Sequence, residues 1–181
     1  MKTKLLISFV FVLSFSAYSQ LDTIFWFAAP AVNGPCGSAP VSLILTNSNN
    51  YDAYVEVTTP AGVLAAVLDT VPANSVKRII LWSDACTAAD QFNRAAIETR
   101  PAGVVGPVPT GLRIHVTNRI PLNAMYEVAG NQSAELFTLK GKNALGSEFF
   151  GLFQTLSNNA IDAFSSINIV ATQDNTVLNI D

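Results

Sequence analysis

Apolar and polar residues alternate with a period of two along several short stretches of this chain. In the clearest stretch, which begins at Leu112, three aliphatic residues are separated by Arg113 and His115. Alternate side chains of a β-strand lie on opposite faces, so this pattern predicts a strand with one buried face. Similar patterns predict strands at 23–28, 41–46, 53–58, 62–68, 76–81, 112–116, 122–128, 134–139, 148–153, 166–172 and 176–180.

Polar turns between these stretches predict three hairpins. The clearest hairpin spans 112–128, and two others span 41–58 and 166–180. Their connections are rich in Asn, Asp and Pro, which favour turns. We therefore expect the two strands of each hairpin to pair with each other.

Helix signals are few. Ser83 and Asp84 precede an alanine-rich stretch that ends near Ala95, and they predict a short helix of one or two turns. The region 101–109 holds three prolines and two glycines and is predicted to be a loop. Together these patterns predict an all-β fold in which antiparallel sheets pack as a β-sandwich. A propeller-like arrangement is the alternative, because the hairpins can equally belong to successive blades.

The N-terminus has the three-part layout of a secretory signal peptide. A cationic start at 1–4 is followed by an apolar run at 5–17, and small residues then precede Gln20. The run has thirteen residues, whereas a membrane-spanning helix needs about 20. We expect residues 1–19 to be removed on export, which leaves one β-rich domain at 20–181 that is secreted or held at the cell surface without a membrane span.

Export changes the interpretation of the two cysteines. Cys36 and Cys86 both fall in the exported part, and an oxidising compartment permits a disulfide between them. Two buried free thiols are the alternative. Their spacing fits no zinc or thioredoxin-like motif.

Composition narrows the classes of function. Half of the residues are apolar and 13% are charged, which excludes a disordered chain. The net charge of −3 provides no basic excess for phosphates, so we expect no nucleic-acid partner. The polar loop 47–52 and the Asp174-Asn175 turn offer oxygens to calcium, but neither is the twelve-residue calcium loop. We expect neither a metal site nor a cofactor.

No catalytic constellation is evident, so no catalytic residue is assigned and we expect the protein not to be an enzyme. His115, the single histidine, falls on the polar face of its strand. A glycosidase needs only two carboxylates, which leaves a secreted carbohydrate-active enzyme as an alternative. The candidate carboxylates are Glu127, Glu135, Glu148 and Asp162.

An aromatic triplet lies near the start of the exported part. Strand alternation sends Trp26 to one face and both Phe25 and Phe27 to the other. Core packing is the expected role of the triplet and of Trp82, with a stacking platform for sugar as the alternative.

Several motifs resemble one known family. They are Phe25-Trp26-Phe27-Ala28-Ala29-Pro30, 120–128, 135–150 and 169–176, and they look like the IgGFc-binding-protein N-terminal domain family of exported Bacteroidota-type surface proteins. Bacterial relatives often carry a gliding-motility-associated C-terminal domain. The most specific part is a loop formed by Lys140, Gly141, Lys142, Asn143, Ala144, Leu145 and Gly146.

The resemblance implies a non-catalytic binding or adhesion module whose partner is a protein or glycan at the cell surface. A structural spacer in a surface assembly is a further alternative. The strand-like pattern at 177–181 ends without a closing element, so we expect the chain to be the N-terminal part of a longer protein.

The loop 140–146 also leads to a structural prediction. Its two glycines are predicted to let the chain reverse between the strands at 134–139 and 148–153. We expect Leu139 and Leu145 to be buried, with Lys140 and Lys142 pointing to solvent.

Overall fold

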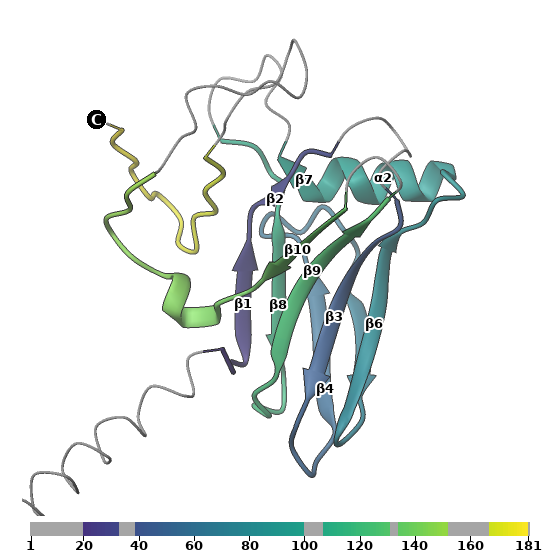
Figure 1. Cartoon of the computed structure of the whole chain (residues 1–181). Coiled ribbons are helices and arrows are strands. Elements are labelled where there is room, and N and C mark those ends of the chain that lie inside the picture. Colours follow the sequence, from purple (N-terminus) through teal and green to yellow (C-terminus); the bar gives the residue numbers. More distant parts are fainter. Residues whose placement is uncertain (1–19, 33–38, 100–106, 131–133, 152–166, 181) are drawn as a thin grey trace, which may run out of the picture.

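Two four-stranded antiparallel sheets face each other in the computed structural model of this chain (Figure 1). It describes residues 20–32, 39–99, 107–130, 134–151 and 167–180; the predicted signal peptide at 1–19 and most of the predicted loop at 101–109 lie outside them. One sheet has the strand order β1-β8-β4-β5 and the other β10-β9-β3-β6. A short parallel pair, β2-β7, lies beside them. The predicted all-β sandwich is therefore confirmed, and the propeller-like alternative is wrong.

Most strand predictions are confirmed to within one or two residues. The observed strands are β1 Ile24–Phe27, β2 Ala29–Pro30, β3 Val41–Asn47, β4 Ala53–Thr58, β5 Val67–Val71, β6 Ser75–Trp82, β7 Glu98–Thr99, β8 Leu112–Val116, β9 Asn123–Ala129 and β10 Ala134–Thr138. The prediction at 62–68 is mostly wrong, because β5 begins at Val67 and Gly62 lies in a preceding turn with φ +68°.

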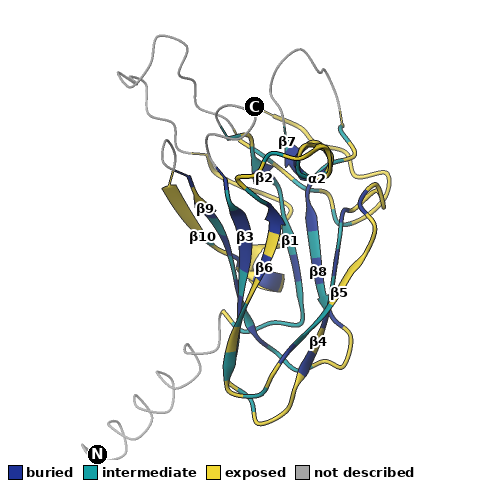
Figure 2. Ribbon diagram, turned by 90° about the vertical axis from the view of Figure 1, so that its right-hand side faces the viewer, coloured by how far each residue is buried: buried dark blue, intermediate teal, exposed yellow. Residues whose placement is uncertain are grey.

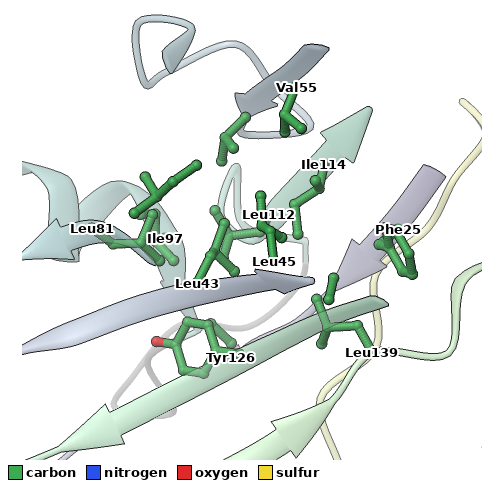
Figure 3. Packing of buried hydrophobic residues seen from close by; sticks show 14 of the residues in the cluster. Phe25, Leu43, Leu45, Val55, Leu81, Ile97, Leu112, Ile114, Tyr126 and Leu139 are labelled. Carbon is green, nitrogen blue, oxygen red and sulfur yellow. The ribbon is translucent and has the colours of Figure 1, made fainter. Parts of the chain in front are cut away.

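The core forms where the alternating apolar residues of the two sheets meet. Leu43 and Leu45 of β3 face Val55 of β4 and Ile114 of β8, and all four side chains are buried (Figure 3). Figure 2 shows the same division, with buried strand segments toward the interior of the sandwich and exposed loops at its ends. The period of two gathers the apolar side chains on one face of each sheet. Burial of these faces, when the sheets stack, drives formation of the sandwich.

An aromatic cluster joins the sheets at the side where β1 approaches β9 and β10. The ring of Phe27 lies 4.9 Å from that of Tyr126 and 5.6 Å from that of Phe137, measured between centroids. Phe25 and Trp82 are buried as predicted. Trp26 is not a core residue, since it lies half-buried on the outer face of its sheet.

Two of the predicted hairpins are instead crossings between the sheets. β8 pairs with β1 and β4, whereas β9 pairs with β3 and β10. Likewise β3 and β4 belong to different sheets. A turn signal between two alternating stretches is the same for a hairpin and for a crossing, so only the burial of both apolar faces decides between them. The hairpins that form are β4–β5 and β9–β10.

The two crossing loops lie at the same end of the sandwich and are tied together. The side chain of Asn118 donates to the Asp52 carbonyl over 2.7 Å and accepts from the Tyr54 amide over 3.1 Å. Asn49 donates from its side chain to the Pro121 carbonyl over 2.6 Å. These bonds satisfy loop groups that a hairpin would have paired differently.

The helix is longer than predicted and starts later. It is α2, Ala88–Ile97, and Thr87 rather than Ser83 or Asp84 is its N-cap. Thr87 accepts from the Asp90 amide while the Asp90 carboxylate accepts from the Thr87 amide, which is a capping box. Ten residues form almost three turns. Within the described ranges, no helix is long and apolar enough to cross a membrane.

The predicted C-terminal strands do not form. The described residues at 148–151 and 167–180 contain no strand. The predicted strand at 148–153 is therefore wrong in its described part. The predicted strands at 166–172 and 176–180 are wrong in their described residues, and so is the hairpin between them. The chain there alternates in sequence, but its large apolar side chains Ile167, Ile169, Val177, Leu178 and Ile180 stay exposed. Alternation that buries no apolar face does not hold a strand.

Candidate binding face

The outer surface of the sheet β1-β8-β4-β5 carries a group of aromatic and charged side chains. We call this group the binding face and define it as Trp26, Tyr54, Glu56, Leu68, Arg113 and His115. Strand alternation places them there, because the intervening residues, such as Phe25, Val57 and Ile114, are buried in the core.

Strand register brings these residues side by side. Trp26 of β1 lies opposite Arg113 of β8. Two residues further along β8, His115 lies opposite Glu56 of β4, and Glu56 in turn lies opposite Leu68 of β5. Residues directly opposite in an antiparallel pair have Cβ atoms about 5 Å apart, so the six side chains cover one continuous patch across four strands.

The charged groups of the binding face are loosely paired. The Glu56 Oε2 atom lies 3.8 Å from Arg113 Nη1 and 3.8 Å from His115 Nδ1. Both separations exceed a hydrogen bond. The Arg113 guanidinium also lies 5.6 Å from the centre of the Trp26 ring, within reach of a cation–π interaction. Because no direct hydrogen bond consumes these groups, an approaching ligand can pair with them at low cost.

An open groove adjoins this patch. It is lined by Tyr54, Val55, Leu68, Asp69, Thr70 and Thr117. Tyr54 is 51% exposed and Leu68 is 74% exposed, although both are large and largely apolar. Exposed apolar groups gathered on one surface are typical of interaction sites.

His115 is on the outer face of its strand, as the alternation predicts. Its ion-pair partner is Glu56. No motif in the sequence marks Tyr54, Glu56, Leu68 or Arg113 as site residues. The signal that could have found them was the presence of a tyrosine and a leucine at the polar positions of two strand patterns.

The candidate carboxylates do not gather on one surface of their hairpin. Glu127 lies on the outer face of β9, while Glu135 of β10 lies opposite the inward-facing Val128 and so belongs to the other face. Glu148 is exposed in the segment after β10, and Asp162 lies outside the described residues. The Glu127–Glu135 pair therefore lacks the shared cleft that a glycosidase requires.

Glu127 is engaged in a small polar cluster on the other sheet. Ser42 Oγ donates to Glu127 Oε2 over 2.7 Å, and Arg78 pairs with the same carboxylate oxygen. Arg78 Nε also donates to Ser42 Oγ over 2.9 Å. The Ser42 hydrogen bond, helped by the Arg78 charge, lowers the pKa of Glu127 below its ordinary value. The Glu127 Oε2 atom is therefore held by two partners within the fold.

Asn47 and Asp52 of the polar loop 47–52 use side-chain oxygens within the fold. The side chain of Asn47 donates to the Tyr51 and Val71 carbonyls over 2.8 and 3.1 Å, and its oxygen accepts from the Asn49 amide over 3.0 Å. Asp52 accepts from the Ala73 amide over 2.8 Å. In the part of the chain that the structure describes, no cluster of three or more His, Cys, Asp or Glu residues could hold a metal ion.

Cys86 lies after β6 and is disulfide-bonded. Its backbone is left-handed, with φ +54°. Cys36, the other cysteine of the sequence, lies outside the described residues. Their pairing with each other stays a prediction.

The loop 140–146 fastens the N-terminal segment to the sandwich. It forms a short 3₁₀ helix, η2, Gly141–Ala144. The Lys142 amide donates to Asp22 Oδ2 over 2.7 Å, and the Leu139 amide donates to the Ala124 carbonyl over 2.9 Å. Leu139 is buried as predicted, but the expectation for Leu145 is wrong, since it is 50% exposed.

The rest of the prediction for this loop is partly right. Lys140 and Lys142 are exposed, and Gly141 has φ +56°. Gly146 does not take a left-handed conformation, and no strand follows it at 148–151. The loop therefore does not reverse the chain between two strands. It closes the side of the sandwich between β1 and β10.

Comparison of the chain with protein-family models, with curated proteins and with solved structures yields no significant match.

Proposed function

We propose that this protein is an exported, non-catalytic binding or adhesion module of a secreted or cell-surface protein. Its ligand is a protein or a glycan at the cell surface, and it docks on the binding face. The resemblance to the IgGFc-binding-protein N-terminal domain family supports the same class of function. The family name makes the antibody Fc region one natural probe.

The observation that carries this proposal is the coincidence of three residue types on one exposed surface. Trp, Tyr and Arg dominate the energetics of protein interfaces, and the binding face presents Trp26, Tyr54 and Arg113. Aromatic rings also stack on the apolar faces of sugars, while Glu56 and the Thr70 hydroxyl beside them can form hydrogen bonds with polar groups. The groove beside Tyr54 and Leu68 gives a ligand a recess to fill.

The test begins with the secreted protein applied to glycan and protein arrays that include Fc. Each ligand found is then measured against Leu68→Ala and Arg113→Ala. We expect each variant to weaken binding about tenfold or more, as residues at the centre of an interface do.

Ile80→Ala is the matched control for Leu68→Ala. Ile80 is an exposed aliphatic residue like Leu68, but it lies on the outer face of the other sheet. Equal loss of binding in Leu68→Ala and Ile80→Ala, or no loss in either variant, would place the ligand elsewhere and overturn the assignment of the face.

Export has an independent test. The intact mass of the secreted protein should correspond to a chain that begins near Gln20. Recovery of the chain from the outside of the cell with residues 1–19 still attached would contradict cleavage.

A further inference from the structure

Two polar side chains that line the groove beside the binding face are already engaged within the fold. The Asp69 Oδ1 atom accepts from the Thr70 amide over 2.7 Å and lies 3.0 Å from Lys77 Nζ. The Thr117 hydroxyl donates to the Tyr54 carbonyl over 3.2 Å. A sugar that enters a groove gives up hydrogen bonds to water and needs new ones from the protein. The groove therefore suits an apolar occupant better than a sugar.

The exposed walls of the groove point to the same kind of occupant. Leu68 of β5 lies opposite Glu56 of β4, and Tyr54 lies two residues before Glu56 on the same face. Leu68 and Tyr54 are therefore diagonal neighbours that one side chain can touch at once. Leucine offers no hydrogen bond to a sugar, whereas an apolar side chain that covers it removes apolar area from water.

Arg113 provides a second recognition element on the same face. Its guanidinium is held over the Trp26 ring, with 5.6 Å between the guanidinium carbon and the ring centre. An arginine held by an aromatic ring still has N–H groups that match both oxygens of a carboxylate. Glu56 lies 3.8 Å from one guanidinium nitrogen, beyond hydrogen-bond distance. Arg113 is therefore oriented by Trp26 without being hydrogen-bonded to Glu56.

The charges of the binding face favour an acidic group over a basic one. Arg113 is permanently charged, and His115 on the same strand adds a positive charge whenever it is protonated. Glu56 is the single carboxylate among the six residues of the face. A carboxylate from a partner would meet the donors of Arg113, whereas an ammonium group would compete with Arg113 for Glu56.

We infer that the partner of the binding face is a protein, which places a large apolar side chain in the groove and an acidic side chain on Arg113. This inference rests on the proposed function, because it names the class of ligand for the same face. It selects a protein from the two classes considered there, protein and glycan.

Strand register sets the spacing of the two anchors. β4 lies between β5, which carries Leu68, and β8, which carries Arg113. Arg113 is also offset by two residues from His115, which shares the row of Glu56 and Leu68. Two strand spacings across and two residues along give a separation of roughly 12 Å. Residues i and i+4 of an extended segment face the same way about 13 Å apart. The partner segment should therefore carry its apolar and acidic residues four positions apart.

The probe is a phage-displayed library of random dodecapeptides, selected on the full secreted protein. We expect the enriched peptides to share a large apolar residue and an Asp or Glu four positions apart. Replacing that Asp or Glu by Asn or Gln should weaken binding to the wild type about tenfold. The same replacement should change binding to Arg113→Ala little, because the pair has already been broken there.

Protein variants separate the arginine fork from simple charge. Arg113→Lys keeps the charge but loses the two-pronged contact, so it should weaken a selected peptide nearly as much as Arg113→Ala. Leu68→Ala should weaken it as well. The matched controls are Arg78→Lys and Ile80→Ala on the outer face of the other sheet, and both should bind as the wild type does. Circular dichroism checks that each variant keeps its β fold.

The outcomes distinguish this inference from the proposed function. Enriched peptides without the apolar and acidic pair, or peptides that bind Arg113→Ala as well as they bind the wild type, would overturn the inference. A glycan that loses binding in both Leu68→Ala and Arg113→Ala, with no peptide enriched, would overturn the inference and support the proposed function. If no peptide, protein or glycan depends on these two residues, both the inference and the assignment of the binding face are overturned.

Discussion

Gly141 occupies a position that excludes any side chain. Its backbone has φ +56°, and a Cβ atom added there would lie 2.5 Å from the Cβ atom of Asp22. Asp22 cannot simply move away, because its carboxylate accepts hydrogen bonds from the Lys142 and Thr23 amides over 2.7 Å each. Only glycine fits at position 141, because any Cβ atom there would collide with the Asp22 side chain.

We expect Gly141→Ala to lower the free energy of unfolding by about 1–3 kcal/mol, the typical cost of a strained left-handed residue. The measurement is urea unfolding. Gly146→Ala is the control, since Gly146 is not left-handed and a Cβ there would approach the exposed ring of Phe149 at 3.2 Å. Equal losses in the two variants would show that the left-handed conformation of Gly141 is not what the fold needs.

A buried ion pair holds the end of α2 to the segment before Cys36. Arg94 Nε lies 2.9 Å from Glu98 Oε2, and the two side chains are almost completely buried. Arg94 also donates to the Val32 carbonyl over 2.6 Å, and the Val32 amide donates to Glu98 over 3.2 Å. Burial, together with the Glu98 charge, raises the pKa of Tyr126 well above its ordinary value, so its hydroxyl stays protonated.

We expect Arg94→Met to cost about 3–5 kcal/mol of stability, because it removes the guanidinium that pairs with the buried Glu98 carboxylate. The double variant Arg94→Met/Glu98→Leu should cost less than Arg94→Met alone, since it removes both charges. Chemical denaturation of both variants measures the difference. A double variant less stable than Arg94→Met would mean that the ion pair contributes more than its desolvation costs.

At the scale of elements, the start of α2 depends on one carboxylate. Asp90 accepts from the Ser83 amide over 2.6 Å and from the Thr87 amide and hydroxyl over 2.9 and 2.6 Å. The Ser83 backbone bond, followed by those from Thr87, lowers the pKa of Asp90 from 3.8 to about 2. The same bonds order the turn that contains Cys86.

This predicts a defined pH dependence for the helix start. A carboxyl group whose pKa is lower in the folded state stabilises the fold above its unfolded pKa, and that contribution is lost as pH falls. The loss should therefore fall between about pH 4 and pH 2. We expect Asp90→Asn to be less stable than wild type at pH 6 and to show a weaker decline over this window, as measured by thermal unfolding. Thr87→Val removes one donor and should shift the window upward; an identical pH profile in wild type and Asp90→Asn would contradict the assignment.

At the scale of the whole molecule, two crossings connect the sheets, and a disulfide at Cys86 adds a covalent link. Cys86 lies just before α2 and is disulfide-bonded. We expect its partner to be Cys36, so that the bridge joins the segment after β2 to the start of α2. In the chain-entropy model, a bridge that closes a loop of about 50 residues contributes roughly 4 kcal/mol.

The check is alkylation of the secreted protein under native, oxidising conditions. We expect no free thiol in the wild type and one in each of Cys36→Ser and Cys86→Ser, with a lower melting temperature in both variants. Two alkylatable thiols in the wild type would contradict the presence of a bridge between Cys36 and Cys86.

Local chemistry alone determined the class of fold and most strand positions. The alternation at β3, β4, β8 and β9 is strong enough to predict each strand, because burial of one face requires a period of two. The same alternation placed His115 outward and Phe25 inward. It could not say which strands pair, since a turn such as 118–121 serves a hairpin and a crossing equally well.

Tertiary structure decided the rest. Only the stacking of two sheets separates β8 from β9 and brings Glu56, Arg113 and Trp26 from three strands onto one face, because residues distant in sequence become neighbours through register. The stretch 176–180 has the pattern of a strand yet forms none, since a strand needs a partner edge and an apolar surface as well as a suitable sequence. Sequence therefore determined which segments can be strands, and packing determined which of them are and what they present to solvent.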